Sequence, residues 1–158
     1  MEKQRHSIIP RTSCLIFHRG KLLLIKYSEK KWEREWWYNR IWWHIEQGEW
    51  IIENAKREIL EETWLVLDVK LKWVIHVSDY FWKNFMLYVT ISESESEVVK
   101  SNDEWTLYRV NPDELDNYKI FKDVKIVLDE IKKLKDWVVF TAKTKFNWEW
   151  DLVNFEME

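Results

Sequence analysis

Three glutamates in the segment REILEET have the type and spacing of a metal-binding cluster. If the segment is helical, Glu58, Glu61 and Glu62 stand at positions i, i+3 and i+4, and their carboxylates share one face. Repulsion between them weakens the helix slightly, whereas Mg²⁺ prefers hard carboxylate oxygens and keeps water and phosphate oxygens in its shell. Arg57 is adjacent and could orient one carboxylate by a hydrogen bond. The alternative is an ordinary solvated acidic face, with Lys56 and Arg57 as ion-pair partners.

The hydrophobic pattern predicts which elements position this helix. Ile52, Ala55, Ile59 and Leu60 recur at helical spacing, which predicts a helix over residues 51–65. The other predicted elements are strands at 13–17, 22–27, 66–77, 85–91, 105–110, 138–141 and 152–155, a hairpin turn at 18–21, a loop at 28–39, a turn or short helix at 112–115 and a helix at 124–134. The order of these elements predicts a mixed sheet covered by helices, an α+β fold in a single domain spanning residues 1–158.

Composition and charge argue against several classes of protein. A net charge of −3 does not suit a protein that grips nucleic acid, because that affinity comes from a basic surface. The longest apolar runs are too short to cross a bilayer, and residues 1–11 lack the apolar core of a signal peptide. Cys14 is the one cysteine, so no internal disulfide can form; we expect a cytoplasmic protein with a buried, inert thiol. The four histidines lack metal-ligand spacing, so a polyanionic substrate would need a cation as intermediary.

Residues 43 to 65 resemble the signature of the Nudix hydrolases, G-x5-E-x7-R-E-U-x-E-E-x-G-U, in which U is aliphatic. Seven of the nine specified positions match: Glu49, Arg57, Glu58, Ile59, Glu61, Glu62 and Leu65. The other two, Trp43 and Trp64, stand where the family has glycine. The resemblance implies a Nudix-type α/β/α sandwich with a mixed β-sheet and a loop-helix-loop catalytic motif. It also implies a Mg²⁺ or Mn²⁺ site whose ligands are Glu58, Glu61, Glu62 and the backbone carbonyl of Trp42.

The chemistry implied by the resemblance is hydrolysis of a nucleoside diphosphate linked to another group. Metal ions neutralise the phosphates, lower the pKa of a bound water and stabilise the leaving oxygen. Arg57, Glu58, Glu61 and Glu62 are the expected catalytic residues, with Glu58 as the carboxylate that takes the proton from water. The expected partner is therefore a small-molecule nucleotide, bound by a monomer or homodimer, with no nucleic acid and no membrane.

Residues 101–115 and 140–150 resemble the MutT-like branch of the family, which hydrolyses nucleoside triphosphates, including oxidised purine nucleotides such as 8-oxo-dGTP, to the monophosphate and pyrophosphate. That resemblance implies that Asn39 and Asp123 contact the base, that Phe121 stacks on it, and that Glu104 lies near the metals. The branch has a second base-contacting acid, at the position of Val124 here. The alternatives are Asn39 as a turn residue and Asp123 as a helix N-terminal acid.

Two other functions are also compatible with the sequence. One is a Nudix pyrophosphatase for a different diphosphate, such as ADP-ribose or a nucleotide sugar, which a substrate screen would distinguish. The other is a catalytically impaired, Nudix-like binding module. Such modules usually lose acids from the helix, and this chain keeps all of them.

Tryptophan and glycine are present in unusual numbers. Typical usage of about 7% would give roughly 11 glycines, but the chain has 2 glycines and 13 tryptophans. Trp42 and Trp43 precede a tight polar turn at 45–49, where we expect a sharp bend that normally needs glycine. Trp64 follows the predicted helix, where glycine commonly adopts the left-handed conformation. Further tryptophans fall at turn signals, namely Trp82, Trp137 and Trp148.

These positions predict that most of the tryptophans stand where the functional protein has glycine. One economical cause is a gene that reads the UGA codon as glycine, translated as if UGA encoded tryptophan. Deliberate substitution is the other. In the family the backbone at Trp42 and Trp43 approaches the metals and phosphates, so an indole there is expected to crowd the site. The chain as written is then expected to be weakly active or poorly folded.

Overall fold

The computed structural model describes residues 7–28, 38–80, 83–133, 139–147 and 152–157. In these ranges nine strands form one mixed sheet in the order β3-β2-β1-β6-β5-β8-β9, with β4 paired to β1 and β7 paired to β2. The strands are β1 (Ile8–His18), β2 (Lys21–Tyr27), β3 (Tyr38–Asn39), β4 (Ile41–His44), β5 (Lys70–Tyr80), β6 (Lys83–Glu93), β7 (Trp105–Val110), β8 (Phe140–Phe146) and β9 (Leu152–Met157).

Strands β1 and β2 form the predicted hairpin. The two residues between them, Arg19 and Gly20, both have positive φ, 48° and 77°, as a tight two-residue hairpin turn requires. β1 then runs parallel to β6 along almost its whole length and pairs with β4 on its other side. The centre of the sheet is therefore built from chain segments far apart in sequence.

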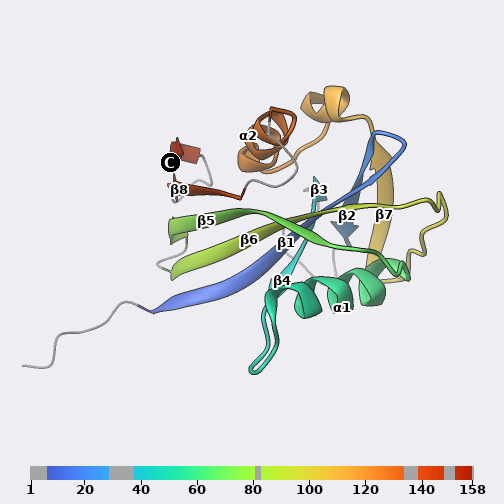
Figure 1. The fold of residues 1–158 in the computed structure, drawn as a ribbon. Helices are drawn as coiled ribbons and strands as arrows, with labels where there is room; N and C mark the ends of the chain where they lie inside the picture. Colours follow the sequence, from blue (N-terminus) through green and yellow to red (C-terminus); the bar gives the residue numbers. More distant parts are fainter. Residues whose placement is uncertain (1–6, 29–37, 81–82, 134–138, 148–151, 158) are drawn as a thin grey trace, which may run out of the picture.

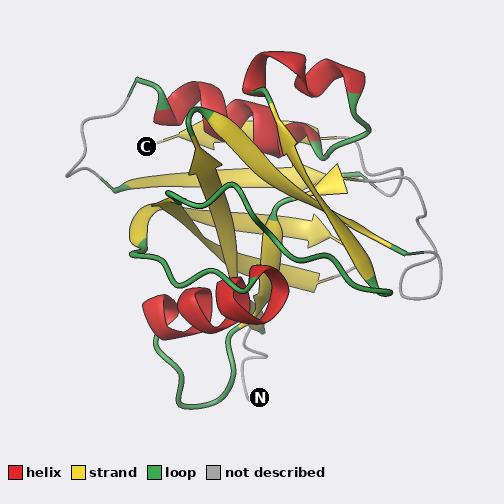
Figure 2. Cartoon of the chain, turned by 90° about the vertical axis from the view of Figure 1, so that its right-hand side faces the viewer, coloured by secondary structure: helices red, strands yellow, loops and turns green. Residues whose placement is uncertain are grey.

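Helices cover both faces of the sheet, as Figures 1 and 2 show. They are α1 (Ile51–Thr63), α2 (Lys122–Ile131) and the short 3₁₀ helix η1 (Pro112–Asn117). Along β1, Cys14 and Ile16 pack on the α1 side, and Leu15 between them packs on the α2 side. Successive strand residues point to opposite faces, so two covered faces explain the continuous apolar runs. The predicted α/β/α sandwich with a mixed sheet is confirmed.

The structure corrects four details of the predicted elements. Strand β5 begins at Lys70 rather than at residue 66, because residues 64–69 form an irregular connection after α1. Leu60 does not belong to the buried face of α1 and is 46% exposed, while Ala55 and Ile59 are fully buried. The prediction also missed β4, which pairs with β1. The predicted strand 138–141 extends to Phe146, and residue 138 lies outside the described residues.

The expectations for Cys14 and for membrane spans can also be compared with the structure. Cys14 is free and buried, and burial raises the pKa of its thiol to about 12, so it is inert as a nucleophile at neutral pH. Among the described residues, no helix has both the length and the apolar character needed to cross a bilayer.

Candidate active site

Glu49 fixes the loop before α1 to the body of the helix. Its Oε1 accepts a hydrogen bond from Arg57 Nε at 2.7 Å, and its Oε2 accepts one from Asn54 Nδ2 at 2.8 Å. Asn54 also donates to the backbone oxygen of His44 at 2.8 Å, which ties α1 to the end of β4. The hydrogen bond from Arg57 lowers the pKa of Glu49 to about 2, so this carboxylate is ionised at all ordinary pH values.

Arg57 gathers the acidic residues of the predicted cluster. Its Nη1 lies 2.6 Å from Glu58 Oε1 and 3.1 Å from Glu61 Oε2, while its Nε holds Glu49. Glu58 is buried, and burial raises its pKa to about 6 in spite of the neighbouring guanidinium. A carboxylate with that pKa is ionised at neutral pH and is well matched to accept a proton from water.

Glu62 is held by side chains from two strands. Its Oε1 accepts hydrogen bonds from Tyr27 Oη at 3.0 Å and from Trp43 Nε1 at 2.7 Å. Burial and the charge of Glu62 both raise the pKa of Tyr27, so its hydroxyl stays a donor. On the backbone side, Trp105 Nε1 donates to the carbonyl oxygen of Glu62 at 3.1 Å. The indole of Trp43, at a signature glycine position, is thus part of the environment of a predicted metal ligand.

The donor chemistry of this cluster fits a divalent cation. Glu58, Glu61 and Glu62 offer hard carboxylate oxygens on neighbouring turns of one helix, which is the ligand type that Mg²⁺ and Mn²⁺ prefer. Their arrangement is not that of an assembled site: within the described ranges, no three His, Cys, Asp or Glu side chains are grouped to hold a metal ion. Glu58 and Glu61 face Arg57, and Glu62 faces Tyr27 and Trp43.

The remaining predicted ligands lie at the edges of the cluster. Glu104 is exposed and immediately precedes β7, whose Trp105 contacts Glu62. The backbone of Trp42 lies in β4, opposite Ser13 of β1. Both assignments stay predictions.

The three residues predicted to contact the base line one small cavity. Asn39, Phe121 and Asp123 contribute to its wall together with Arg40 and Trp42. The rest of the lining is apolar, from Val77, Phe85, Leu87 and Phe146. The cavity volume of about 30 Å³ is enough for about two water molecules. It is too small for a purine ring while the Trp42 indole stands in its wall.

Arg40 is the charged residue of this cavity that was not predicted from the sequence. Its Nη2 donates to Asp123 Oδ2 at 2.7 Å, and both side chains are less than a tenth exposed. Its Nε donates to Ser13 Oγ, and its backbone N–H donates to Asn39 Oδ1 at 2.9 Å. A charged residue between Asn39 and the apolar run Ile41–Trp43 was the available signal, because a charge in such a run needs a buried partner.

The structure corrects the expected bend at the paired tryptophans. Trp42 and Trp43 have extended backbone in β4, and among the described non-glycine residues only Arg19 and Trp64 have positive φ. The chain turns later, at Gly48, with φ 87°. Because side chains alternate along a strand, Trp42 packs with the core on the α2 side and Trp43 with the core on the α1 side.

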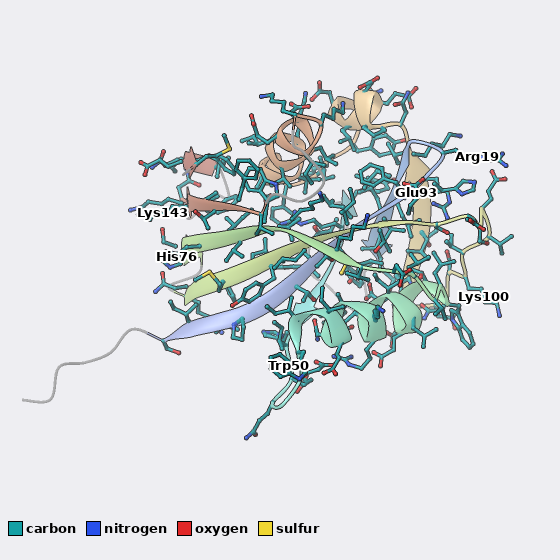
Figure 3. The ribbon with its side chains drawn as sticks, in the orientation of Figure 1. Arg19, Trp50, His76, Glu93, Lys100 and Lys143 are labelled. Atoms are coloured by element: carbon teal, nitrogen blue, oxygen red, sulfur yellow. The ribbon has the colours of Figure 1, made fainter. Side chains whose placement is uncertain are left out.

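The two ends of α1 differ in how they accommodate tryptophan. Trp50 is the N-cap and is 76% exposed, and Figure 3 shows it at the start of the helix. Its backbone N–H donates to Glu53 Oε2 at 3.0 Å, which is half of a capping box. Trp64, the C-cap, has left-handed φ and ψ of 64° and 18°, the conformation expected of glycine at that position. Trp82, Trp137 and Trp148 lie outside the described residues.

Comparison with solved structures places this architecture in a known fold. A MutT mutator protein from Bacillus halodurans superposes with a TM-score of 0.78 over 96% of this chain and 98% of its own, at 18% identity. The MutT protein of Methanosarcina mazei Go1 gives 0.69 over 84% and 100%, at 18% identity. The Nudix domain of Shewanella oneidensis NrtR, solved with ADP-ribose, gives 0.67 over 83% and 91%, at 9% identity. No protein-family model and no curated protein matches the chain. The chain has the Nudix hydrolase fold.

Proposed function

We propose that this protein is a divalent-metal-dependent hydrolase that cleaves nucleoside triphosphates to the monophosphate and pyrophosphate. The observation that carries the proposal is the grouping of Glu49, Glu58 and Glu61 around Arg57, on a helix of a Nudix fold. The geometry of β4 gives further support. Trp42 lines the cavity and its neighbour Trp43 contacts the acidic cluster, so one strand connects a space for a base with a place for phosphates.

The residues of the acidic cluster would have distinct roles in hydrolysis. A metal held by Glu58, Glu61 and Glu62 would neutralise phosphate charge and lower the pKa of the attacking water. Glu58 is ionised at neutral pH and would accept the proton of that water. Arg57 holds the carboxylates in position through contacts of 2.6 to 3.1 Å. Glu49 keeps Arg57 oriented and ties the loop to the helix.

The proposal is tested by removing charge from the cluster without changing side-chain size. Glu61→Gln and Glu62→Gln should each abolish release of monophosphate and pyrophosphate, while circular dichroism shows an unchanged fold. Glu53→Gln is the matched control, because Glu53 lies on the same helix, outside the cluster, and glutamine can also serve in a capping box. Full turnover in both cluster variants, or in excess chelator, would contradict the proposal.

Within this proposal we favour purine nucleoside triphosphates, including 8-oxo-dGTP, because the MutT proteins superpose over most of the chain. The second candidate substrate is a nucleoside diphosphate linked to another group, which the ADP-ribose complex of the NrtR domain supports. The two are separated by a nucleotide screen with identification of products. Triphosphates would yield pyrophosphate, whereas ADP-ribose would yield AMP and ribose 5-phosphate.

A further inference from the structure

Arg40, in the wall of the cavity, has more side-chain N–H donors than acceptors that they contact. A guanidinium carries five N–H groups and no acceptor. In the described part of the chain, Ser13 Oγ and Asp123 Oδ2 are the acceptors that its side chain contacts. The ion pair with Asp123 compensates the buried charge, so Arg40 is stable there without using all of its donors. N–H groups therefore remain for a ligand in the cavity.

The neighbouring amide makes the polar part of the cavity still richer in donors. Asn39 Oδ1 is occupied by the backbone N–H of Arg40, so the amide N–H groups are what Asn39 can offer a ligand. Asp123 is the acidic acceptor in the lining, and one of its oxygens is already bound to Arg40. The opposite walls are aromatic and aliphatic. This arrangement suits a flat ring system whose edge carries acceptors.

We propose that Arg40 determines base specificity by binding the O6 and N7 acceptors of a guanine that is not oxidised at C8. In 8-oxoguanine N7 carries a proton and is a donor, so this contact narrows the proposed purine substrates to unoxidised guanine nucleotides. Guanine presents both acceptors on that edge, and an arginine fork can contact both. Adenine presents its N6 amino group there, which would place donor against donor and leave a buried N–H without a partner. The inference rests on the proposed function, because it takes the cavity to be the base site.

Binding of a purine has to be tested in chains that lack the Trp42 indole, because this side chain lines the cavity. Its side chain is a fused five- and six-membered ring system, as is a purine, and the cavity beside it holds only about 30 Å³. Removing the indole opens a space of the right shape while leaving Arg40, Asn39 and Asp123 in place. The test therefore uses the full chain carrying Trp42→Gly, with Trp42→Ala in parallel so that the result does not depend on one variant folding.

The experiment measures binding of GMP and AMP by calorimetry in the absence of metal, so that no turnover is needed. The Trp42→Gly and Trp42→Ala chains should bind GMP about tenfold more tightly than AMP, the discrimination that one bidentate arginine contact provides. Adding Arg40→Lys keeps the charge opposite Asp123 but removes the fork, and should bring the two affinities within about twofold. Arg109→Lys is the control, because Arg109 contacts Ser96 and Glu97 and does not line the cavity.

Three outcomes would overturn the inference: equal affinity for GMP and AMP in the opened chains, no binding of either, or an unchanged preference after Arg40→Lys. Its failure is distinguishable from failure of the proposed function. The proposed function fails when Glu61→Gln and Glu62→Gln keep full turnover, whereas base preference is measured here without hydrolysis.

Discussion

Replacement of Trp64 by glycine should give a more stable protein than replacement of Trp64 by alanine. Trp64 ends α1 in the left-handed conformation, φ 64° and ψ 18°, and its backbone N–H donates to Leu60 O at 2.9 Å. Any residue with a β-carbon is strained in that conformation, by about 1 kcal/mol. Glycine is not, because it lacks the atom that crowds the following carbonyl.

The loss of the indole works in the opposite direction and is of similar size, but it is common to the glycine and alanine variants. Trp64 is 66% exposed, so little apolar surface leaves water when the side chain is present. Its main partner is Lys100, whose Nζ lies 4.4 Å from the ring centroid. An exposed cation–π contact of this kind contributes about 0.5–1 kcal/mol. Trp64→Gly loses this contact and relieves the strain, whereas Trp64→Ala loses the contact and keeps the strain.

The difference between the two variants isolates the conformational effect from the contact with Lys100. We expect Trp64→Gly to exceed Trp64→Ala by about 1 kcal/mol in free energy of unfolding, or about 2–4 °C in Tm. Urea denaturation gives the first quantity, provided that the two m-values agree, and thermal melting followed by circular dichroism gives the second. If the alanine variant proves as stable as the glycine variant, position 64 carries no left-handed strain and the reasoning is wrong.

Two further predictions concern the loop and the cavity. The pKa of Glu49 is lowered from 4.5 to about 2, so its ionised form stabilises the fold above pH 4.5 and this stabilisation is lost as the pH falls toward 2. Glu49→Gln should therefore cost on the order of 1–2 kcal/mol at pH 7 and nothing below pH 2 in urea denaturation; an identical pH dependence in both proteins would contradict this. Asn39→Ala or Asp123→Ala should raise KM or flatten the ranking of nucleotides in steady-state assays, with Asp123→Asn as the variant that leaves Arg40 a hydrogen-bond partner. Unchanged ranking in all of them would place the base site elsewhere.

The features that could be predicted from the sequence are those set by local spacing. The i, i+3, i+4 pattern of Glu58, Glu61 and Glu62 falls on α1 as expected, because helical periodicity is a property of the segment itself. The hairpin between β1 and β2 is equally local, since its turn needs only two residues with positive φ. Pairing across the sheet is different. The parallel pairs β1–β6 and β5–β8 are set by tertiary packing and leave no repeat in the sequence.

Tertiary contacts, which leave no local pattern in the sequence, are also the parts of the site that were not predicted. The segment Ile41–His44 lacks the alternation of a half-buried strand because both of its faces are covered, so β4 was not predicted. The Arg40–Asp123 ion pair joins residues 83 positions apart, and no local pattern relates them. The contact of Trp43 with Glu62 could not be predicted either, because the resemblance to the Nudix signature gave position 43 no side chain to consider.

The two tryptophans of β4 act on both halves of the proposed site. Trp43 donates its indole N–H to Glu62, a predicted metal ligand, and Trp42 stands in the wall of a cavity with room for about two waters. Glycine at both positions would leave Glu62 bonded to Tyr27 and would open the cavity. The strand itself does not require glycine, since its backbone is extended there. The physical case for glycine at 42 and 43 is therefore access for a substrate, and at 64 it is backbone strain.

Replacing Trp42, Trp43 and Trp64 together by glycine should raise the rate of hydrolysis, which we expect to be low in the chain as written. The assay is release of pyrophosphate from nucleoside triphosphates with Mg²⁺, and equal rates in both chains would show that the indoles do not obstruct the site. Glycine at 64 alone should change stability without changing the rate, because Trp64 is largely exposed, packs against Lys100 and does not line the cavity. The origin of the tryptophans is settled separately, by mass spectrometry of the native protein. Peptides with glycine at these positions are expected if UGA is read as glycine, and peptides with tryptophan at all three would refute that explanation.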